Sequence, residues 1–482
     1  MMRIPMDRSS LCLVNPPLTG SVRECHLPVG LLSLAAAIRA AGFSASVLDL
    51  HVAWGRGELP SATLIEAAAD RILQQEPRII GFTTMCTSYL TSALVAKRCK
   101  AINDELVVIF GGPQASAVDH ETLDLLPWVD LVVRGEGEDT LPDLLLALSE
   151  GMALDQVAGI TYRAPDGRIA RTPQRGARQD LGSLSVPAYD ALPSLEPYRG
   201  SMAVEGGRGC PFACTYCCVR SAFDKSYRQY RVPPPNKIAH EMEILRAMTG
   251  VATFSILHPL FTCDRRFVDA FCKELEQHDT HLRWSCCART NSVPPELLSE
   301  MARAGCGGMF FGAESGSDET LKLVRKKVDA SRTLPAVRAC LSAGIQPTVS
   351  LMIGFREERA DQLNLTLELA LACAHQGRVN VDLHLVSLLP QTEMWHTHKD
   401  KLVLTDFALC CGDMGLGRTP TSEERDLVEK NPETFSSFYS LLPEHLDLHL
   451  LHAIRTGFSF VVVFRARTFL LIMERGQRSG LA

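Results

Sequence analysis

The sequence predicts an α/β protein in which two parallel-sheet domains follow one another. Short apolar segments alternate with helical segments over residues 1–150, and six further strand–helix units follow over residues 201–390. We therefore expect an N-terminal doubly wound, Rossmann-like sheet and, after it, a partial (β/α)6 barrel. Pro187, Pro193 and Pro197 mark residues 151–200 as a linker, and residues 391–482 are expected to form a mainly helical C-terminal region.

In the first domain, each expected strand is a short apolar run and each expected helix repeats its apolar residues every three or four positions. The strands are 11–17, 46–50, 78–82, 106–110 and 129–133, and the helices are 27–41, 62–75 and 93–103. Ligands of such a sheet bind outside the carboxyl ends of its strands, where glycines let the backbone approach a large flat molecule. The candidate ligand-binding residues at those ends are Asn15, Pro16, Pro17, Thr83, Thr84, Gly111, Gly112, Pro113, Gly135, Glu136 and Gly137.

The second domain shows the same alternation, with its first strand beginning at Met202. The further strands are expected at 251–257, 282–287, 308–316, 347–354 and 381–388, and the helices at 237–248, 266–278, 295–304, 330–343 and 360–375. Chemistry in a β/α barrel gathers at the carboxyl ends of the strands. Between the domains, Arg163 to Gly167 is a turn signal that separates two short strand-like pieces.

A dense cysteine motif follows the first strand of the second domain. Cys210, Cys214 and Cys217 are spaced C-x3-C-x2-C, directly after Gly206–Gly209, and the aromatic Tyr216 precedes the last cysteine. Cysteine thiolates are the usual ligands of iron–sulfur clusters, and a four-iron cluster takes four ligands. Three local cysteines leave one iron open to bind and activate a small molecule.

A structural zinc site is the alternative for this motif, completed by Cys218 or by the Cys286–Cys287 pair. Structural zinc sites usually show two separated ligand pairs, which disfavours this interpretation. The 17 cysteines are otherwise scattered, often beside apolar residues, unlike those of a small secreted disulfide scaffold. This distribution predicts a cytoplasmic protein.

Charge and hydropathy narrow the expected partners. The formal net charge is -6 and no basic stripe dominates, so nucleic acid is not the expected partner. The first residues contain Arg3, Asp7 and Arg8 before any apolar run, so no signal peptide is expected. No stretch reaches about 20 uninterrupted apolar residues, so we expect no transmembrane segment.

The cysteine spacing with Tyr216 resembles that of the radical S-adenosylmethionine (SAM) enzymes. Residues 10–150 resemble the cobalamin-binding domain that precedes the barrel in many of them, the class B methyltransferase-like group. The resemblance implies three cofactors: a 4Fe-4S cluster on Cys210, Cys214 and Cys217, SAM, and cobalamin at the strand ends of the first domain.

Several strand ends of the barrel resemble the family residue by residue. Gly312 to Ser315 resembles the G-x-E-S strand, which implies that Glu314 and Ser315 contact SAM, and Arg289 stands where the family often places an arginine facing the site. Met352 to Gly354 resembles the adenine-side strand, and Leu323 to Lys326 is expected to continue the helix after the glutamate strand. His258-Pro259 departs from the family, whose members often carry acidic residues there, and suggests the substrate side.

A histidine pattern after the second strand resembles a cobalt-binding motif but departs from it. Asp49-Leu-His51 followed by Gly55 is similar to the D-x-H-x-x-G motif that supplies histidine to cobalt in other cobalamin proteins. Here the glycine is one position late, and the match follows the second strand rather than the first. We expect His51 to be a surface or interdomain histidine and cobalt to lack a protein histidine, with His26 as a weaker candidate.

The resemblance implies a reaction. An electron from the cluster cleaves SAM to a 5′-deoxyadenosyl radical, which abstracts hydrogen from carbon, and methylcobalamin supplies a methyl group to the substrate radical. The prediction is a cobalamin-dependent radical SAM methyltransferase, with a non-methylating cyclase or ring-rearranging enzyme as the alternative. Its partners would be a small-molecule or peptide substrate and an external electron donor of the flavodoxin or ferredoxin type.

Two further classes are less favoured by the sequence. A cobalamin or iron–sulfur sensor would carry a DNA-binding or signalling module, which the sequence does not suggest. A methylthiotransferase would carry three more clustered cysteines upstream, whereas the upstream cysteines are dispersed at Cys12, Cys25, Cys86 and Cys99.

The C-terminal region is less readable. Gln391 to Trp395 resembles the loop that closes the barrel, and a metal role for His396 and His398 is disfavoured. Cys410-Cys411 are expected to be packed, and the apolar stretch 458–473 is expected to be a core or dimer helix rather than a membrane-surface helix.

Overall fold

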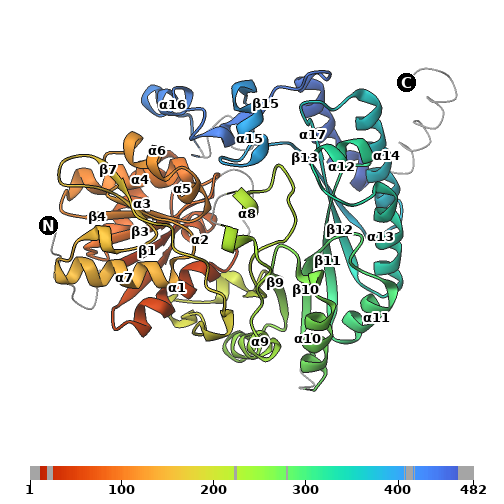
Figure 1. The fold of residues 1–482 in the computed structure, drawn as a ribbon, viewed down its shortest axis with the longest axis horizontal. Coiled ribbons are helices and arrows are strands. Elements are labelled where there is room, and N and C mark those ends of the chain that lie inside the picture. Colours follow the sequence, from red (N-terminus) through yellow and green to blue (C-terminus); the bar gives the residue numbers. More distant parts are fainter. Residues whose placement is uncertain are drawn as a thin grey trace.

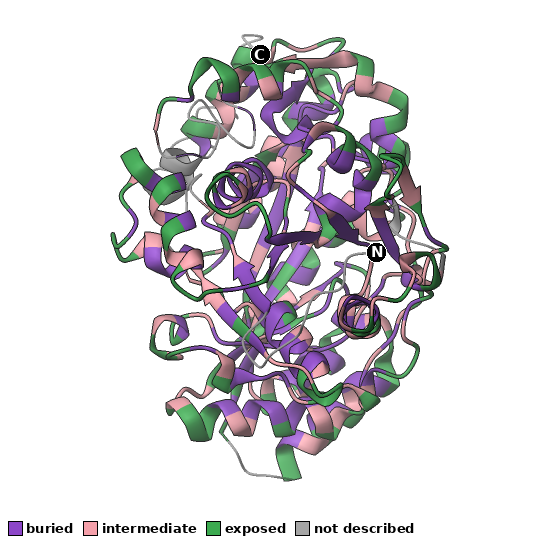
Figure 2. Cartoon of the chain, turned by 90° about the vertical axis from the view of Figure 1, so that its left-hand side faces the viewer, coloured by how far each residue is buried: buried purple, intermediate pink, exposed green. Residues whose placement is uncertain are grey.

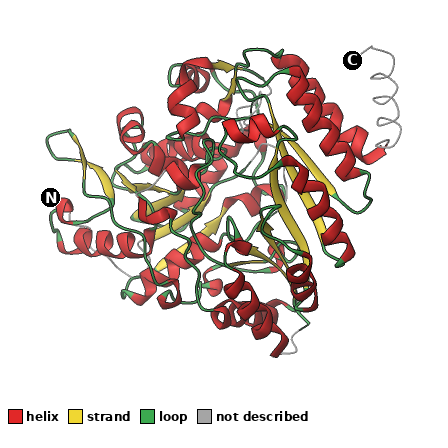
Figure 3. Ribbon diagram, turned by 45° about the vertical axis from the view of Figure 1, so that its right-hand side comes forward, coloured by secondary structure: helices red, strands yellow, loops and turns green. Residues whose placement is uncertain are grey.

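The computed structural model describes residues 11–18, 25–221, 225–277, 281–406, 408, 416 and 418–464. Two sheets lie side by side, the first from the N-terminal part and the second from the middle of the chain, with C-terminal elements above and between them (Figure 1). The strands run inside and the helices surround them (Figure 3). Buried positions concentrate on the strands and on the inner faces of the helices (Figure 2).

The N-terminal sheet has the strand order β2-β1-β3-β4-β5-β6-β7. The first five strands are parallel, in the doubly wound order 2-1-3-4-5, with the switch of direction between β1 and β3. The predicted fold class is therefore confirmed. The strands are β1 (Leu11–Asn15), β2 (Ala45–Asp49), β3 (Ile79–Thr83), β4 (Val107–Gly111), β5 (Leu131–Val133), β6 (Ile160–Arg163) and β7 (Ile169–Arg171).

The predicted linker contributes to this sheet. β6 and β7 form an antiparallel hairpin that extends the sheet beyond β5, around a turn in which Gly167 has φ +84°. The two strand-like pieces were expected from the sequence, but their place in the first sheet was not. Residues 160–171 therefore belong to the N-terminal domain rather than to a linker.

Alternating strand residues build two cores on opposite faces of the N-terminal sheet. Leu11 and Leu13 pack with α1 and α7, and this core continues into the helices and strands of the second domain. Cys12 and Val14 point to the other face and pack with α3 and α4. The helices are α1 (Val29–Ala40), α2 (Leu50–Gly55), α3 (Leu64–Leu73), α4 (Tyr89–Ile102), α5 (Pro113–Ala117), α6 (Asp119–Leu125) and α7 (Gly137–Glu150).

The second sheet is fully parallel, in the order β13-β12-β11-β10-β9-β8, and confirms the predicted partial barrel of six strands. Its strands are β8 (Ala203–Glu205), β9 (Thr253–Leu257), β10 (Arg283–Ala288), β11 (Cys306–Glu314), β12 (Gln346–Ile353) and β13 (Asn380–Leu385). The helices of this part are α8 (Cys218–Ser221), α9 (Pro235–Thr249), α10 (Arg265–Gln277), α11 (Pro295–Arg303), α12 (Asp318–Leu323), α13 (Thr333–Ser342) and α14 (Ala360–Ala374).

One predicted helix is shorter than expected. α12 ends at Leu323, so Arg325 and Lys326 lie in a turn instead of continuing the helix. Arg325 and Lys327 have φ values of +55°, and such left-handed conformations cannot continue a right-handed helix.

The C-terminal region bridges the two domains. Phe435, Phe438 and Tyr439 pack into the α3–α4 core of the N-terminal domain, and the rings of Tyr89 and Phe435 lie 5.4 Å apart. Leu451 packs instead against the barrel. The elements are α15 (Glu393–His398), β14 (Leu402–Leu404), α16 (Ser422–Glu429), β15 (Tyr439–Leu441) and α17 (Leu448–Phe464), with β14 and β15 paired antiparallel (Figure 1).

Two predictions for this region fall partly outside the described residues. Cys410 and Cys411 lie outside them, as does the apolar stretch beyond Phe464. Among the described helices, none is both long enough and apolar enough to cross a bilayer.

Candidate functional site

A cavity of about 1270 Å³ lies between the two domains. One wall is the carboxyl edge of the N-terminal sheet, and the other is formed by the barrel strands β8 to β13. The cavity therefore reaches from the strand ends where the sequence predicted cobalamin to Gly209 and Val219, on either side of the cysteine motif, whereas the predicted barrel residues do not line it: Cys210, Cys214, Cys217, Arg289, Glu314 and Ser315. The predicted residues that line it are Thr83, Gly111, Gly112, Pro113, Gly135, Glu136 and Gly137.

Backbone conformation explains two of these glycines. Gly112 has φ +90°, and a Cβ there would lie 2.8 Å from the backbone N and O of Thr84. Gly135 has φ +82°, and a Cβ there would overlap the Tyr227 hydroxyl. Larger residues would be strained at both positions and would fill the edge of the cavity.

The remaining predicted residues of this edge do not line the cavity. Thr84 is fully buried, its hydroxyl donates to the Gly111 carbonyl oxygen at 2.8 Å, and it accepts from the Ala115 N–H at 3.0 Å. Thr84 therefore braces the β4–α5 loop. Asn15 ends β1, Pro16 and Pro17 follow it, and none of the three is among the lining residues.

The cavity continues into the N-terminal domain as an apolar slot between the sheet and helices α1 and α7. Such a slot can take an extended appendage of a ligand whose flat body lies at the glycine edge. The slot went unrecognised in the sequence because its helix residues have the spacing of ordinary core positions. The residues are Leu13, Gly81, Ile109 and Val133 from the sheet, and Gly30, Leu31, Leu34 and Leu141 from the helices.

The glycine edge and the slot together fit a corrinoid. Cobalamin combines a large flat ring with a long side chain, and the described residues offer a backbone-lined edge for the one and an apolar slot for the other. Lining side chains that could supply a cobalt ligand are few, and His51 and His26 are not among them.

His51 is buried, at 3% exposure, so the expectation of a surface position is wrong. Its Nδ1 accepts from the Leu18 N–H at 3.2 Å, and its ring stacks on Trp54 at 6.0 Å. The sequence did not reveal why His51 is buried, which is that it lies in the short helix α2. Asp49 caps that helix by accepting from the Val52 N–H at 3.1 Å, so the D-x-H pattern is a helix start. His26 is exposed.

The three motif cysteines lie in the loop between β8 and α8. Burial is the main cause that raises the pKa of the Cys217 thiol to about 12, and the neighbouring thiols of Cys218, Cys214 and Cys210 raise it further. The Cys217 thiol therefore needs a metal to ionise at neutral pH. No three His, Cys, Asp or Glu side chains of the described residues are grouped as ligands of a single metal ion. In a four-iron cluster, each cysteine binds a different iron.

The cluster loop is fixed from several sides. The Thr215 N–H donates to the Val324 carbonyl oxygen at 3.1 Å, and the Met394 N–H of α15 donates to the Thr215 carbonyl oxygen at 2.9 Å. The ring of Tyr216 lies 6.5 Å from that of Phe355, which follows β12. The loop therefore touches both the barrel and the C-terminal region, as the resemblance of residues 391–395 to a closing loop implied.

Arg289 is a buried cation beside the cluster loop. It is 6% exposed, and its guanidinium lies 3.8 Å from the centre of the Phe212 ring. Its Nε and Nη2 have no hydrogen-bond partner among the described residues. A buried unpaired cation is costly, so this place favours an anion such as the carboxylate of SAM or a thiolate-bound cluster. The residues present therefore fit both groups.

Glu314 and Ser315 have different environments. Glu314 is buried and its Oε1 lies 2.6 Å from Lys326 Nζ. The Ser315 hydroxyl lies 2.9 Å from that of Thr366 and accepts from the Ser317 N–H at 3.1 Å. Ser315 therefore ties the end of β11 to α14, while Glu314 faces the cluster loop.

His258 lines the cavity at the departure from the family pattern. Its Nδ1 accepts from the Leu260 N–H at 2.8 Å. Burial, with a smaller effect from Arg231, lowers the pKa of His258 to about 4. The ring is therefore neutral at physiological pH and carries its proton on Nε2, so it can act only as a donor there.

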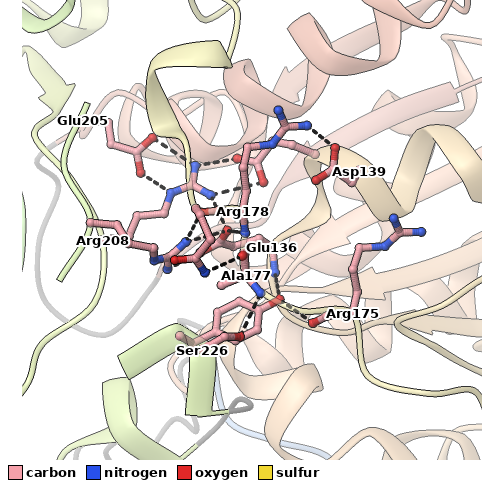
Figure 4. Close-up of polar contacts among 12 residues, drawn as sticks. Glu136, Asp139, Arg175, Ala177, Arg178, Glu205, Arg208 and Ser226 are labelled. Atoms are coloured by element: carbon pink, nitrogen blue, oxygen red, sulfur yellow. Dashed lines mark hydrogen bonds and ion pairs between the residues drawn. The ribbon is translucent and has the colours of Figure 1, made fainter. Parts of the chain in front are cut away.

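An ionic cluster joins the domains at the cavity wall (Figure 4). We call it the interdomain clasp, defined by Glu136, Glu138, Arg208, Glu205 and Arg231. Arg208 from the barrel contacts Glu138 at 2.6 Å and Glu136 at 3.3 Å, both from the start of α7. It also contacts Glu205 at 2.5 Å, and Arg231 contacts Glu136 at 2.6 Å. The clasp thus links the loop after β5 directly to the residues that precede Cys210.

Comparisons with known proteins agree with the succession of an N-terminal sheet domain and a partial barrel in this chain. The model of the radical SAM superfamily matches residues 204–370, and that of the B12-binding domain matches residues 16–145. An uncharacterized methyltransferase of Pyrococcus horikoshii is 28% identical over 374 residues, covering 76% of this chain and 78% of the relative. The hopanoid C-3 methylase of Methylococcus capsulatus is 26% identical over 400 residues, covering 79% and 70%.

Other relatives carry a different name. The anaerobic magnesium-protoporphyrin IX monomethyl ester cyclase of Rubrivivax gelatinosus is 27% identical over 311 residues, which cover 62% of this chain. The matched part spans only 55% of that relative's length.

Solved structures show the same fold. The radical SAM methyltransferase TsrM of Kitasatospora setae, with tryptophan and a SAM analogue bound, matches with a TM-score of 0.72 and 20% identity, covering 95% of this chain and 90% of that chain. The cobalamin-dependent SAM radical enzyme OxsB with aqua-cobalamin matches with a TM-score of 0.68 and 20% identity, covering 86% and 64%.

Proposed function

The chain belongs to the radical SAM proteins that carry a B12-binding domain, and we propose that it is a cobalamin-dependent methyltransferase acting on a carbon centre. One observation carries the proposal: a single cavity joins the glycine edge of the B12-binding domain to the barrel beside the cluster loop. A substrate in that cavity can meet both reactive centres. Relatives named as methyltransferases or methylases over most of this chain support the same activity.

Each cofactor has proposed ligands in this chain. Cys210, Cys214 and Cys217 would hold a 4Fe-4S cluster, and Arg289 and Glu314 would contact the SAM on its open iron. Cobalamin would lie on the edge formed by Thr83, Gly111 to Pro113, and Gly135 to Gly137. When bound, the cluster and SAM supply a carbon radical by reductive cleavage, and cobalamin supplies a carrier for the methyl group.

The protein's own residues would bind and orient the ligands and shield them from water. Arg289 offers unpaired N–H donors to an anion, and burial keeps competing water away from it. The glycines admit a flat ligand without specific side-chain bonds. Neutral His258 can donate one hydrogen bond from Nε2 to an acceptor atom in the cavity, and it stays neutral across the physiological pH range because its pKa is about 4.

A non-methylating cyclase is the second candidate. It is favoured by the relatives named as magnesium-protoporphyrin cyclases, which are 26–27% identical to this chain. Their names describe a ring-forming reaction.

The remaining partners follow from the cofactors. A reduced cluster needs an external electron donor, of the flavodoxin or ferredoxin type, and the substrate would be a small molecule or a peptide. A cytoplasmic location suits an oxygen-sensitive cluster and the cysteines of the described chain, none of which forms a disulfide.

Product analysis separates the two candidates. With a strong reductant, SAM and the substrate, a methyltransferase releases 5′-deoxyadenosine and S-adenosylhomocysteine together, because SAM serves both as radical source and as methyl donor. SAM with a deuterated methyl group then adds the label to the product. A cyclase gives 5′-deoxyadenosine without stoichiometric S-adenosylhomocysteine. Product of unchanged methyl content, measured by mass spectrometry, would refute the methyltransferase proposal.

A further inference from the structure

Lys326 is a buried lysine in the turn after α12, at 7% exposure. Its Nζ lies 2.6 Å from Glu314 Oε1 and donates to the Tyr216 hydroxyl at 3.4 Å. One ammonium group therefore connects the end of β11 with the cluster loop. The sequence predicted that Lys326 continues the helix after β11, and this prediction did not indicate its contact with Glu314 or with Tyr216.

The backbone around this contact adopts unusual conformations. Glu314 has φ +67°, and Arg325 and Lys327, on either side of Lys326, both have φ +55°. Left-handed conformations of non-glycine residues are unfavourable and persist where surrounding contacts impose them. Three such residues meet at one ion pair, which indicates that the pair and its surroundings hold the local backbone in place.

Gly312 leaves the space that the pair occupies. A Cβ at this position would lie 2.6 Å from Glu314 Oε1 and 3.0 Å from Lys326 Nζ. The pair is also nearly closed to water, since the side chains of Lys326 and Glu314 are 9% and 10% exposed. Buried charges in proteins are paired, and removal of one partner leaves the other uncompensated.

Tyr216 completes the connection on the cluster side. It lies between Cys214 and Cys217 in the sequence, and its hydroxyl accepts from Lys326 Nζ at 3.4 Å. The same loop is held to the turn by the bond from the Thr215 N–H to the Val324 carbonyl oxygen, at 3.1 Å. The turn that contains Lys326 therefore grips the cluster loop by backbone and by side chain.

We propose that Lys326 is a positioning residue of the SAM site, which holds the Glu314 carboxylate and the Tyr216 hydroxyl in one fixed arrangement. Glu314 can then meet SAM only in the orientation that the cluster loop also requires. This proposal rests on the proposed binding of SAM beside the cluster and is independent of what happens to the methyl group.

The test compares SAM binding by reconstituted variants without any substrate. Lys326→Met removes the charge and the hydrogen bonds, and Lys326→Gln keeps a donor without the charge. Lys327→Met is the matched control, since Lys327 is exposed and lies next to Lys326 in the chain. SAM affinity is measured by titrating the anaerobically reduced protein and following the electron paramagnetic resonance (EPR) signal of its cluster. Iron content confirms that each variant is loaded.

We expect Lys326→Met to weaken SAM binding about tenfold or more, the effect of losing a charge-assisted hydrogen bond, and to change the EPR signal of the SAM complex. Lys326→Gln should weaken binding severalfold, and Lys327→Met should stay within about twofold of the wild type. Four irons should be retained in all of them.

An unchanged affinity and EPR signal in Lys326→Met would overturn the proposal, as would equal losses in Lys326→Met and Lys327→Met. If Lys326→Met does not fold, Lys326→Gln decides: a wild-type affinity and signal in that variant overturn the proposal. A protein that binds SAM as expected but never transfers a methyl group would contradict the proposed function and leave this role intact.

Discussion

The glycine edge of the interdomain cavity and the cluster site beside the cavity are built by different means. At the glycine edge the backbone dominates: Gly112 and Gly135 provide positive φ and open space, and Thr84 uses its hydroxyl inside the fold. The cluster site, which does not line the cavity itself, is built from thiols and buried charges, among them Arg289 and Lys326. A large, flat ligand such as a corrinoid needs room and many weak contacts, whereas a small charged centre needs a few side chains in exact positions.

The difference predicts how each site fails. A backbone-lined edge tolerates most side-chain changes but not a new side chain that occupies its space. A site of thiols and charges tolerates no loss of a group. Some variants should lose the cluster and keep the corrinoid, and others should do the reverse. Such variants would confirm that the cluster site and the corrinoid site are built from separate residues.

The largest effect is expected from the cysteine motif. Cys210→Ala, Cys214→Ala and Cys217→Ala should each abolish the four-iron cluster, because three protein ligands are already the minimum and each loss frees another iron. Corrinoid binding should persist, since these thiols do not line the cavity. Iron and sulfide analysis with absorbance spectra of anaerobically reconstituted protein measures both.

Cys218→Ala is the matched control and should keep its cluster. Full iron content in any of the three motif variants would contradict the assignment. Zinc instead of iron in protein purified under nitrogen would favour the structural zinc site.

The reciprocal effect is expected from Gly30, which lies in α1 and lines the cavity. A Cβ at Gly30 would meet no atom within 4 Å, so Gly30→Leu places a side chain in the cavity without a clash in the protein. We expect corrinoid affinity to fall about tenfold or more, the equivalent of ~1.4 kcal/mol, while the cluster is retained. Equilibrium binding of hydroxocobalamin, followed by absorbance, measures the loss.

Gly457→Leu is its control, because Gly457 is also a helical glycine with open space around it but lies in α17, away from the cavity. Equal corrinoid affinity in Gly30→Leu and in the wild type would place the ligand elsewhere.

The same difference explains what the sequence could predict. The cluster loop was readable because three thiols and Tyr216 are adjacent in the chain, and chemistry that depends on local spacing is visible in a sequence. The two parallel sheets and the glycines at the strand ends followed from alternation of apolar segments, and most strands and helices were placed within a few residues, whereas the strand order came only from the structure. Thr84 was predicted to bind the ligand, and only the structure shows that its hydroxyl bonds to the β4–α5 loop instead.

Other features depend on residues far apart in the chain and were therefore hidden. The interdomain clasp joins Glu138 to Arg208, and the Lys326 contact joins residue 326 to Tyr216. The packing of Phe435 against Tyr89 connects the C-terminal region to the N-terminal domain. Charged residues at such positions look like solvated surface in a sequence, since their partners carry no local signal.

A moderate effect is expected when the clasp is broken. Arg208→Met leaves the buried carboxylate of Glu138 without its ion-pair partner, while Glu136 keeps Arg231, and should lower the free energy of unfolding by about 3–5 kcal/mol near neutral pH. Denaturant unfolding of the cofactor-free protein measures this change. Arg199→Met is the control: the Arg199–Glu196 pair is exposed, so its loss should change stability by less than about 1 kcal/mol.

The effect of Arg208→Met should depend on pH. Burial alone would raise the pKa of Glu138, but Arg208 outweighs burial and holds that pKa below its ordinary value of 4.5. A carboxylate with a depressed pKa stabilises the fold above its ordinary pKa, and this contribution is lost as the pH falls through the depressed value. The difference between wild type and variant should therefore shrink in acid, and a constant difference from pH 7 to pH 3 would contradict the assignment.

The smallest effect concerns the visible spectrum of bound corrinoid in His51→Ala, which we expect to match that of the wild type. A histidine on cobalt would have to present an unprotonated ring nitrogen to the cavity, and His51 is not among the residues that line it. Its Nδ1 is engaged by the Leu18 N–H, and its ring stacks on Trp54. Truncation should still lower the free energy of unfolding, by about 1–3 kcal/mol, because the partly buried backbone N–H of Leu18 loses its acceptor. Unfolding and absorbance measured on the same sample separate these roles, with His26→Ala, at an exposed site, as the control for both. A clear spectral shift in His51→Ala, without one in His26→Ala, would show that His51 reaches the metal and that the N-terminal wall recognises its ligand through a side chain after all.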